Sequence, residues 1–518
     1  MTTTEQTDTF PVQWDDPADA AQTWHFSDEH MPHAVAPLEF ELGLNDFLVG
    51  FGWGMQPRQI NYYVFFTMGA PASAPPPATT PDAVREAARR WNEDLLPEVL
   101  RNIEYFRTTD FDAMSNEQLI AEVERLKELR FRSGQIHTMA ISPHWQGMGL
   151  LIQTFKELTG GDDLGAMRLV QGYPNKSVES SERLWQVSRV ANNIPSVRDR
   201  ILAIESAAAH EMFAALRDDA DAAPFVEAFD AYLEEYGWRS NAGFGSPTWY
   251  EDPAVPLALL RAYLQTEGYD PAAEHHRLLD ERDAFERETL ASLPDDAARD
   301  RLRDAIDAAR AVAPQLEDHN FFIDQRFQTM PRRLVLAAGR RAGLAKPNDV
   351  FYLDTAQLFA ALRGEARDLD PLAQQRKAEL EKWRAVKPPL YVGVAPPQGA
   401  PQQARPAPAE AADGLRGTGV SAGVARGPAR IIAGLGEADR LRPGDILVTS
   451  VTQPAWTPLF AVARGVVTEV GGMLSHTAVA SREFGLPAVV NVRDAMRSIR
   501  DGQLVEVDGA AGTIRIVG

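Results

Sequence analysis

The stretch GGMLSHTAVASREFGLPAVV, from Gly471 to Val490, decides how the C-terminal part of this chain folds. Its two leading glycines allow a tight turn, and residues Thr477 to Phe484 favour a helix that Gly485 ends. The sequence therefore predicts that Ser475 caps this helix and that His476 lies in its first turn. Backbone N–H groups without a helical partner point out of such a turn, so an anion can bind there.

The segments around this stretch place it in a longer pattern. TQPAWTPLFAVARGVVTEVGG, from Thr452 to Gly472, precedes it, and DGQLVEVDGAAGTIRIVG, from Asp501 to Gly518, follows it. The block from Gly417 to Gly518 resembles the swivelling phosphohistidine domain shared by pyruvate phosphate dikinase, phosphoenolpyruvate synthase and rifampin phosphotransferase. The resemblance implies that His476 is the phosphorylated residue. For an isolated Ser-His pair, the alternative is a helix cap followed by a surface histidine.

The same block offers groups that can hold a phosphoryl group on His476. Two hydroxyls are candidate donors, the turn supplies backbone N–H groups, and an arginine six residues along the helix is a candidate charge partner. A solvent-facing helix residue is the alternative for the arginine, and a simple N-cap is the alternative for the serine. The predicted phosphate-binding residues are Gly471, Gly472, Ser475, Thr452, Thr468 and Arg482.

Composition sets the limits of the possible functions. The chain has 518 residues, 52 basic and 73 acidic side chains, and a net charge of −21, which disfavours nucleic acid or an anionic membrane as partner. It has no cysteine, so a thiolate nucleophile and a Cys-ligated metal are excluded. The N-terminus has neither a basic start nor an apolar run, and no stretch approaches 18 apolar residues. We therefore expect a cytoplasmic protein.

Changes in composition and residue pattern along the chain predict a multidomain protein in three parts. Residues 387–413 are rich in Pro, Ala and Gln and are expected to form an extended hinge linker. Residues 414–518 contain short β-branched runs separated by glycines, which predict a C-terminal α/β domain that carries His476. Residues 1–386 are mostly helical in pattern; Ser115 and Gln118, for example, form a capping box before an apolar stripe.

Three segments of the helical part resemble the antibiotic-binding domain of rifampin phosphotransferase. They are LVQGYPNKSVESSERLWQVSRVA from Leu169 to Ala191, YLEEYGWRSNAGFGSPTWYEDP from Tyr232 to Pro253, and NDVFYLDTAQLFAAL from Asn348 to Leu362. In the second segment, Trp238 replaces the family's histidine, and Arg239 matches its arginine. The resemblance implies that residues 1–386 bind the phosphoryl acceptor, with Trp238 making the acceptor pocket more apolar.

Transfer to a hydroxyl needs a general base and a cation near the attacking oxygen. LEDHNFFIDQRF, from Leu316 to Phe327, clusters acidic residues around His319, which is the best base candidate in the helical part. A histidine on a helix surface is the alternative. We assign catalytic roles to His476, His319 and Arg239, and acceptor-binding roles to Asp318, Asp324, Trp238 and Tyr236. The aromatic run from Gly50 to Met68 could line a flat apolar pocket, or simply be core.

No metal ligands are assigned. His25, His30 and His33 lie close together in sequence, but no matching carboxylate or HExxH spacing accompanies them.

The chain shows neither an ATP-grasp region nor a GxxxxGK[ST] motif. We therefore expect Mg²⁺ and ATP to bind mainly to a separate ATP-grasp subunit, as in phenylphosphate synthase and the cresol-phosphorylating enzymes, whose split organisation this chain resembles. The resemblance implies a two-component, ATP-dependent phosphotransferase that acts on a small, phenolic acceptor and yields AMP and phosphate. The alternatives are a non-catalytic phosphocarrier or regulatory subunit, and a kinase component for an antibiotic or another alcohol.

Overall fold

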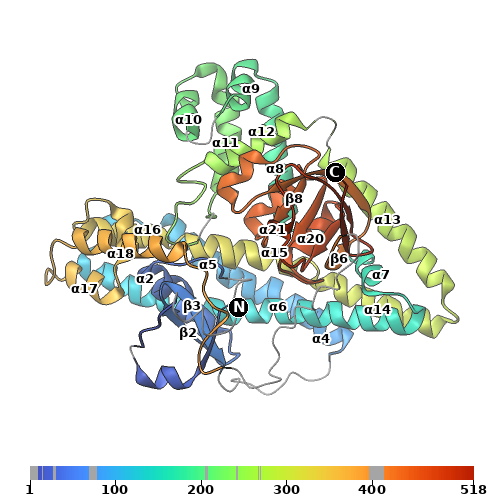
Figure 1. The fold of residues 1–518 in the computed structure, drawn as a ribbon, viewed down its shortest axis with the longest axis horizontal. Coiled ribbons are helices and arrows are strands. Elements are labelled where there is room, and N and C mark those ends of the chain that lie inside the picture. Colours follow the sequence, from blue (N-terminus) through green and yellow to red (C-terminus); the bar gives the residue numbers. More distant parts are fainter. Residues whose placement is uncertain are drawn as a thin grey trace.

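The computed structural model describes residues 10–14, 16–26, 31–68, 79–204, 208–240, 243–266, 268, 270–395 and 414–517. A helical body forms the first part of the chain, and an α/β domain forms its C-terminal part (Figure 1). Both parts agree with the fold class expected from the sequence.

A single helix of 44 residues, α6 (Asn116–Thr159), runs through the body. The predicted capping box starts it: Ser115 accepts a hydrogen bond from the N–H of Gln118, whose side chain accepts one from the N–H of Ser115. The apolar stripe that follows, at Leu119, Val123 and Leu126, is completely buried. Helices α3, α4, α14, α15 and α16 pack on α6, so this helix positions most of the body.

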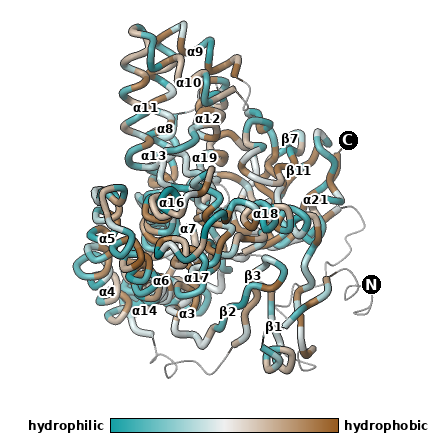
Figure 2. The backbone as a smooth tube through the Cα atoms, turned by 90° about the vertical axis from the view of Figure 1, so that its left-hand side faces the viewer, coloured by the Kyte–Doolittle hydropathy of each residue, from teal (hydrophilic) through white to brown (hydrophobic). Residues whose placement is uncertain are grey.

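The other helices of the body surround α6 or form the upper lobe seen in Figure 1. Hydrophobic and hydrophilic stretches alternate along them, for example along α11, as expected for helices with one buried face (Figure 2). Three π-helical segments interrupt the α-helices: η2 (Phe40–Asn45), η3 (Trp91–Leu95) and η7 (Asn320–Phe327). The α-helices are α2 (Pro37–Glu39), α3 (Asp46–Gly50), α4 (Pro81–Arg90), α5 (Leu96–Thr108), α7 (Asp163–Arg168), α8 (Lys176–Asn192), α9 (Pro195–Leu202), α10 (Ala209–Arg217), α11 (Ala223–Tyr236), α12 (Ala254–Gln265), α13 (Pro271–Ser292), α14 (Asp296–Val312), α15 (Gln315–His319), α16 (Arg332–Arg341), α17 (Thr355–Leu362) and α18 (Asp370–Arg384).

A small antiparallel sheet accompanies the body, in the order β2-β3-β1-β4. Its strands are β1 (Thr23–Phe26), β2 (Met55–Ile60), β3 (Tyr63–Met68) and β4 (Tyr391–Gly393). Strand β4 belongs to the segment whose composition predicted a linker, and it pairs with β1 instead, Trp24 opposite Val392. Tyr391, Val392 and Val394 are residue types that favour strands, although the prolines on both sides favour a linker. Residues 396–413 of the predicted linker lie outside the described residues.

The α/β domain is built on an eight-stranded sheet in the order β5-β12-β11-β7-β8-β9-β10-β6. Strands β7, β8, β9 and β10 run parallel at its centre. The central strands are apolar because both faces are covered, and all residues of β8, β9 and β10 are buried. The elements are β5 (Leu415–Arg416), β6 (Thr418–Ser421), β7 (Val424–Ile431), β8 (Ile446–Thr449), α19 (Thr457–Phe460), β9 (Gly465–Thr468), α20 (His476–Glu483), β10 (Ala488–Val490), α21 (Ala495–Ser498), β11 (Leu504–Asp508) and β12 (Thr513–Ile516).

The α/β domain lies against the body, with α19 and α20 on α8 (Figure 1). This arrangement brings the connection between β9 and α20 to the body. Among the described helices, none has both the length and the apolar character that a membrane span requires.

Candidate active site at the domain interface

His476 occupies the first turn of α20, as the sequence predicted. Ser475 is the N-cap: its Oγ accepts a hydrogen bond from the N–H of Ala478 at 3.4 Å and donates one to the carbonyl of Gly472 at 2.9 Å. Gly471 has a φ of +135°, a conformation that residues with a side chain rarely adopt, so the turn depends on it. The sequence thus fixes His476 at the start of a helix.

The partner of His476 comes from the body. Nδ1 of His476 lies 3.0 and 3.1 Å from the two carboxylate oxygens of Glu317 in α15. Both side chains are nearly enclosed, with exposed fractions of 8% and 2%. A carboxylate accepts, so Nδ1 of His476 carries the hydrogen, and Nε2 lies on the opposite side of the ring. Thr457 of α19 lies on that side, with its Oγ1 3.5 Å from Nε2.

Glu317 is held as a carboxylate by its surroundings. Burial alone would raise its pKa, but the charge of His476 and hydrogen bonds from His476 and Ser177 outweigh burial and lower the pKa. The Ser177 hydroxyl donates to Glu317 at 2.5 Å. Sequence reasoning assigned no role to Glu317, Ser177 or Thr457. Glu317 and Ser177 lie near His476 only because the body packs on the α/β domain, and Thr457 comes close through the fold of the α/β domain itself.

The other predicted phosphate-binding residues lie around the turn in different roles. Thr452 Oγ1 is 2.8 Å from Thr477 Oγ1, beside His476 in the chain. The Thr468 hydroxyl donates to the carbonyl of Val470, at 2.7 Å. Arg482 is buried, unlike the solvent-facing alternative, and its Nη1 donates to the carbonyls of Val420 and Met473 at 3.1 and 3.0 Å. In this arrangement Arg482 ties the loop before His476 to β6.

His319 lies at the end of α15, two residues beyond Glu317. Its Nδ1 is 2.7 Å from the carbonyl of Gln315, and its Nε2 is 3.8 Å from Oδ2 of Asp324. Burial, followed by the charge of His137, lowers the pKa of His319 to about 4, so its imidazole is neutral. His137 of α6, which the sequence left unassigned, places Nδ1 3.2 Å from Oδ1 of Asp324.

Arg239 is also buried, with an exposed fraction of 1%. Among the described residues, none forms a hydrogen bond with its guanidinium nitrogens. The guanidinium lies over the rings of Trp249 and Phe321, at 5.0 and 5.6 Å from their centres. Burial of a cation without a polar partner costs free energy, so the Arg239 guanidinium can bind an anionic group favourably.

The remaining predicted acceptor residues contact the same part of the body. The Tyr236 hydroxyl donates to Glu179 at 2.5 Å, and the indole of Trp238 donates to the carbonyl of Glu234 at 3.0 Å. Trp238 also stacks on Tyr250, with ring centres 4.6 Å apart.

Asp318 accepts a hydrogen bond from the N–H of Lys176 at 2.8 Å. Burial raises the pKa of Asp318 to about 6, against the opposing effect of this bond. His25 lies in β1 between the rings of Phe66 and Tyr391, and His30 lies outside the described residues.

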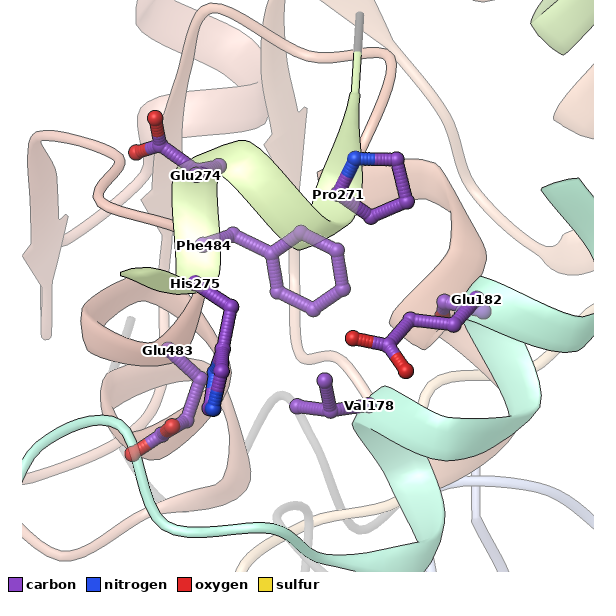
Figure 3. Close-up of a pocket in the computed structure, with 8 residues that line it drawn as sticks. Val178, Glu182, Pro271, Glu274, His275, Glu483 and Phe484 are labelled. Carbon is purple, nitrogen blue, oxygen red and sulfur yellow. The ribbon is translucent and has the colours of Figure 1, made fainter. Parts of the chain in front are cut away.

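A narrow pocket with a cavity volume of about 10 Å³ follows the interface beyond the site. Figure 3 shows Val178 and Glu182 of α8, His275 of α13 and Phe484 after α20 around it. Glu483, on the same rim, accepts a hydrogen bond from the N–H of Gly172 in the body at 3.0 Å. The domains therefore meet along the whole of α20, and not only at His476.

Both sides of this interface are similar to domains of known proteins. Residues 441–512 match the mobile domain of PEP-utilising enzymes, and residues 136–317 match the fourth domain of rifampicin phosphotransferase. His476 lies inside the first match, and Glu317 is the last residue of the second.

Three relatives show how far the similarity extends. Chondramide synthase of Chondromyces crocatus is 31% identical over 98% of this chain, which covers 14% of that protein. An uncharacterized phosphotransferase of Bacillus subtilis is 27% identical over 80% of the chain, covering 51% of the relative. Rifampicin phosphotransferase of Streptomyces sviceus is 36% identical over 56% of the chain, covering 34% of the relative. The chain spans about half the length of these curated relatives or less.

The part of the chain that carries His476 is thus similar to the mobile domain of PEP-utilising enzymes, and the part that ends at Glu317 is similar to a domain of rifampicin phosphotransferase.

Proposed function

We propose that this chain transfers a phosphoryl group from His476 to the hydroxyl of a small acceptor bound by the helical body. The contact between His476 and Glu317 across the domain interface carries the proposal, because it fixes the imidazole tautomer that a phosphohistidine cycle needs. The matches to phosphotransferases support the same reaction class.

In the first half-reaction, Nε2 of His476 attacks a phosphorus atom of Mg-ATP in line. A P–N bond forms as the P–O bond to the nucleotide breaks. We propose that an ATP-grasp subunit holds the nucleotide and Mg²⁺. Water hydrolyses the second phosphoanhydride bond of the nucleotide, so that AMP and phosphate are the other products. Glu317 belongs to the body, so it acts in the second half-reaction and not in this one.

In the second half-reaction, the acceptor oxygen attacks the phosphorus of phospho-His476. The P–N bond breaks, and its electron pair returns to Nε2. A proton on Nδ1, held by Glu317, lets the ring leave as neutral imidazole. The acceptor hydroxyl loses its proton to a base, for which His319 is the candidate, and Arg239 balances the negative charge.

A phenol is the proposed acceptor. A series of ring contacts leads from the half-exposed Trp145 through Trp53 and Phe51 to His137, each ring centre 4.7 to 6.2 Å from the next. His137 in turn meets the ring of His319 at 4.7 Å. Aromatic rings favour offset-stacked and edge-on neighbours, so a phenol that reaches the exposed end of this series, at Trp145, would meet a ring on which it can stack.

The reaction class is tested by labelling. The chain is incubated with an ATP-grasp partner and γ- or β-labelled ATP, and the protein-bound label is characterised. Acid-labile, base-stable label is expected on the wild type and not on His476→Ala. Label that persists in His476→Ala would refute the assignment, and turnover by the rigorously purified chain alone would refute the need for a partner.

The acceptor class is tested separately. Phenol, cresols, pyruvate and a rifamycin are each supplied with partner and Mg-ATP, and acceptor-dependent AMP release is measured. Phenols are expected to give the fastest release. Release with pyruvate or rifamycin alone would refute the phenolic acceptor and leave the phosphohistidine cycle intact.

A phosphocarrier or regulatory subunit is the second candidate function. The interface pocket favours it, because its cavity volume of about 10 Å³ is far below the roughly 300–1,000 Å³ of usual ligand pockets. A carrier would accept label on His476 and pass it to a protein, with no acceptor from the panel accelerating AMP release.

A further inference from the structure

Three side chains near the active site could together bind a metal ion. The proposed reaction uses one of them, His319, only as a base. Their ligand atoms belong to His137 in α6, to His319 at the end of α15 and to Asp324 in the π-helix η7, and these atoms lie within 4.8 Å of one another. Two imidazole nitrogens and one carboxylate oxygen form a donor set typical of divalent transition metals.

The π-helix explains why Asp324 meets His319. Residues five apart in an α-helix point to different sides, whereas the wider π-helical turn returns the fifth residue to the side of the first. η7 begins directly after His319, so Asp324 comes back toward the imidazole. π-helical turns are frequent at functional sites, and an ordinary α-helix at this place would separate the two side chains.

The backbone orients His319 toward Asp324. The carbonyl of Gln315 can only accept, so Nδ1 of His319 carries the hydrogen of their contact. The other ring nitrogen, Nε2, faces the Asp324 carboxylate at 3.8 Å, and Nδ1 of His137 lies 3.2 Å from the same carboxylate. A backbone carbonyl that holds the second ring N–H is also the usual support of a metal-binding histidine.

Apolar rings enclose the other side of the cluster. Phe51 stacks flat on His137, with ring centres 4.7 Å apart and planes 1° from parallel, and Phe47 meets the same ring edge-on at 5.4 Å. His319 is buried, whereas Asp324 keeps 29% of its side chain exposed, which leaves an entry path. Such a shell limits the coordination of a bound ion to three protein ligands and an open position.

We propose that His137 Nδ1, His319 Nε2 and a carboxylate oxygen of Asp324 bind a divalent transition-metal ion such as Zn²⁺. Zinc binds nitrogen and oxygen ligands at about 2.0–2.2 Å, so binding would draw the three side chains slightly together. Mg²⁺ prefers oxygen ligands and does not suit this set.

His319 belongs to the same short helix as Glu317, the partner of His476. With the ion bound, His319 would hold it instead of acting as a base, and the ion would bind the acceptor oxygen and lower the pKa of its hydroxyl; this role, but not metal binding itself, rests on the proposed function.

The test uses the full chain stripped of metal with a chelator. Zn²⁺ is titrated by calorimetry, and Co²⁺ by its visible absorption, which reports the ligand set. We expect one ion per chain, at least tenfold weaker binding in Asp324→Asn and His137→Gln, and wild-type binding in the control His276→Ala, whose histidine lies on the exposed face of α13. Circular dichroism confirms that each variant is folded, and either variant suffices if the other fails to fold.

Absence of binding, or equal binding in the wild type and a folded site variant, would overturn the proposal. His476 labelling is measured in the same samples. Metal binding without label would leave the metal site standing and refute the phosphohistidine cycle. Label without metal binding would refute the metal site and leave the phosphohistidine cycle standing.

Discussion

At the scale of single residues, the buried polar side chains of the active site lie in two contrasting environments. His476 and Glu317 satisfy each other across the interface, and Ser177 completes the carboxylate. Arg239 is enclosed with no hydrogen-bond partner among the described residues. The first arrangement stabilises one tautomer, and the second keeps a cation ready for a ligand at a cost in stability.

Glu317→Gln should slow the transfer step selectively. Glutamine still accepts a hydrogen bond from Nδ1 but carries no charge to balance a protonated ring, so loss of phosphoryl from phospho-His476 to the acceptor should slow on the order of 100-fold. Formation of phospho-His476 should be unchanged, because Glu317 belongs to the body. Rapid-quench measurement of both steps checks this, with Glu211→Gln on the exposed face of α10 as control. Equal slowing of both steps would contradict it.

Arg239→Met and Arg130→Met should differ in their effects on stability. Both arginines are buried, but Arg130 donates three hydrogen bonds of 2.8 to 2.9 Å to the carbonyls of Leu42, Phe327 and Gln328. Arg130→Met leaves these carbonyls unsatisfied and should lower the free energy of unfolding by about 3 kcal/mol or more.

Arg239→Met removes a charge that has no hydrogen-bond partner among the described residues. The free energy of unfolding should change by less than about 1 kcal/mol, while acceptor-dependent turnover falls at least tenfold. Urea denaturation and AMP release measure the two quantities. A large loss of stability in Arg239→Met would make Arg239 a structural residue.

At the scale of elements, the crossing of α3 and α6 sets the position of His137. Gly50 of α3 and Gly134 of α6 allow the two backbones to touch, since a Cβ on either would collide with a main-chain carbonyl of the other helix, at Phe131 or Phe47. α3 ends one residue before Phe51, whose ring stacks on His137. The close crossing thus keeps Phe51 in contact with the ring of His137.

Gly134→Ala should separate these helices. The collision is with backbone, which cannot rotate away, so the free energy of unfolding should fall by about 1–3 kcal/mol. Gly149→Ala on the same helix meets nothing within 4 Å and should raise it by about 1 kcal/mol through helix propensity. Urea denaturation of the two variants is the measurement, and a stable Gly134→Ala would show that the crossing can relax.

At the scale of the whole molecule, the contact between mobile domain and body contains a titrating group. Burial raises the pKa of Glu483 to about 8, although its carboxylate accepts a hydrogen bond from Gly172. A carboxyl group whose pKa is raised on docking binds a proton more tightly when docked. Docking is therefore strongest below the ordinary pKa of 4.5 and weakens as pH rises toward about 8.

Docking of the mobile domain should consequently weaken between pH 6 and pH 8, and Glu483→Gln should remove most of this dependence. The chain has no native cysteine, so dyes can be attached to cysteines introduced in α13 and α21 and the domain separation followed by energy transfer. A pH-independent separation in the wild type, or an unchanged pH dependence in Glu483→Gln, would exclude Glu483 as the titrating group.

The sequence by itself determined the features that depend on neighbours along the chain. The turn at Gly471, the cap at Ser475 and the position of His476 follow from local backbone preferences, and the capping box of α6 was predicted for the same reason. His319 and Asp324 were also selected from the sequence, because they lie in one short cluster, and their roles in the reaction stay predictions. Strand β4 was missed because a partner far along the chain, β1, overrides the composition of its segment.

Only the tertiary structure decided which groups surround His476. Glu317 lies 159 residues away in sequence and Ser177 still further, and no local pattern encodes the docking of one domain on another. Likewise, His137 joins His319 and Asp324 only because α6 passes beside the π-helix η7. Local sequence encodes helices and their ends, whereas a site between elements depends on how their buried faces pack.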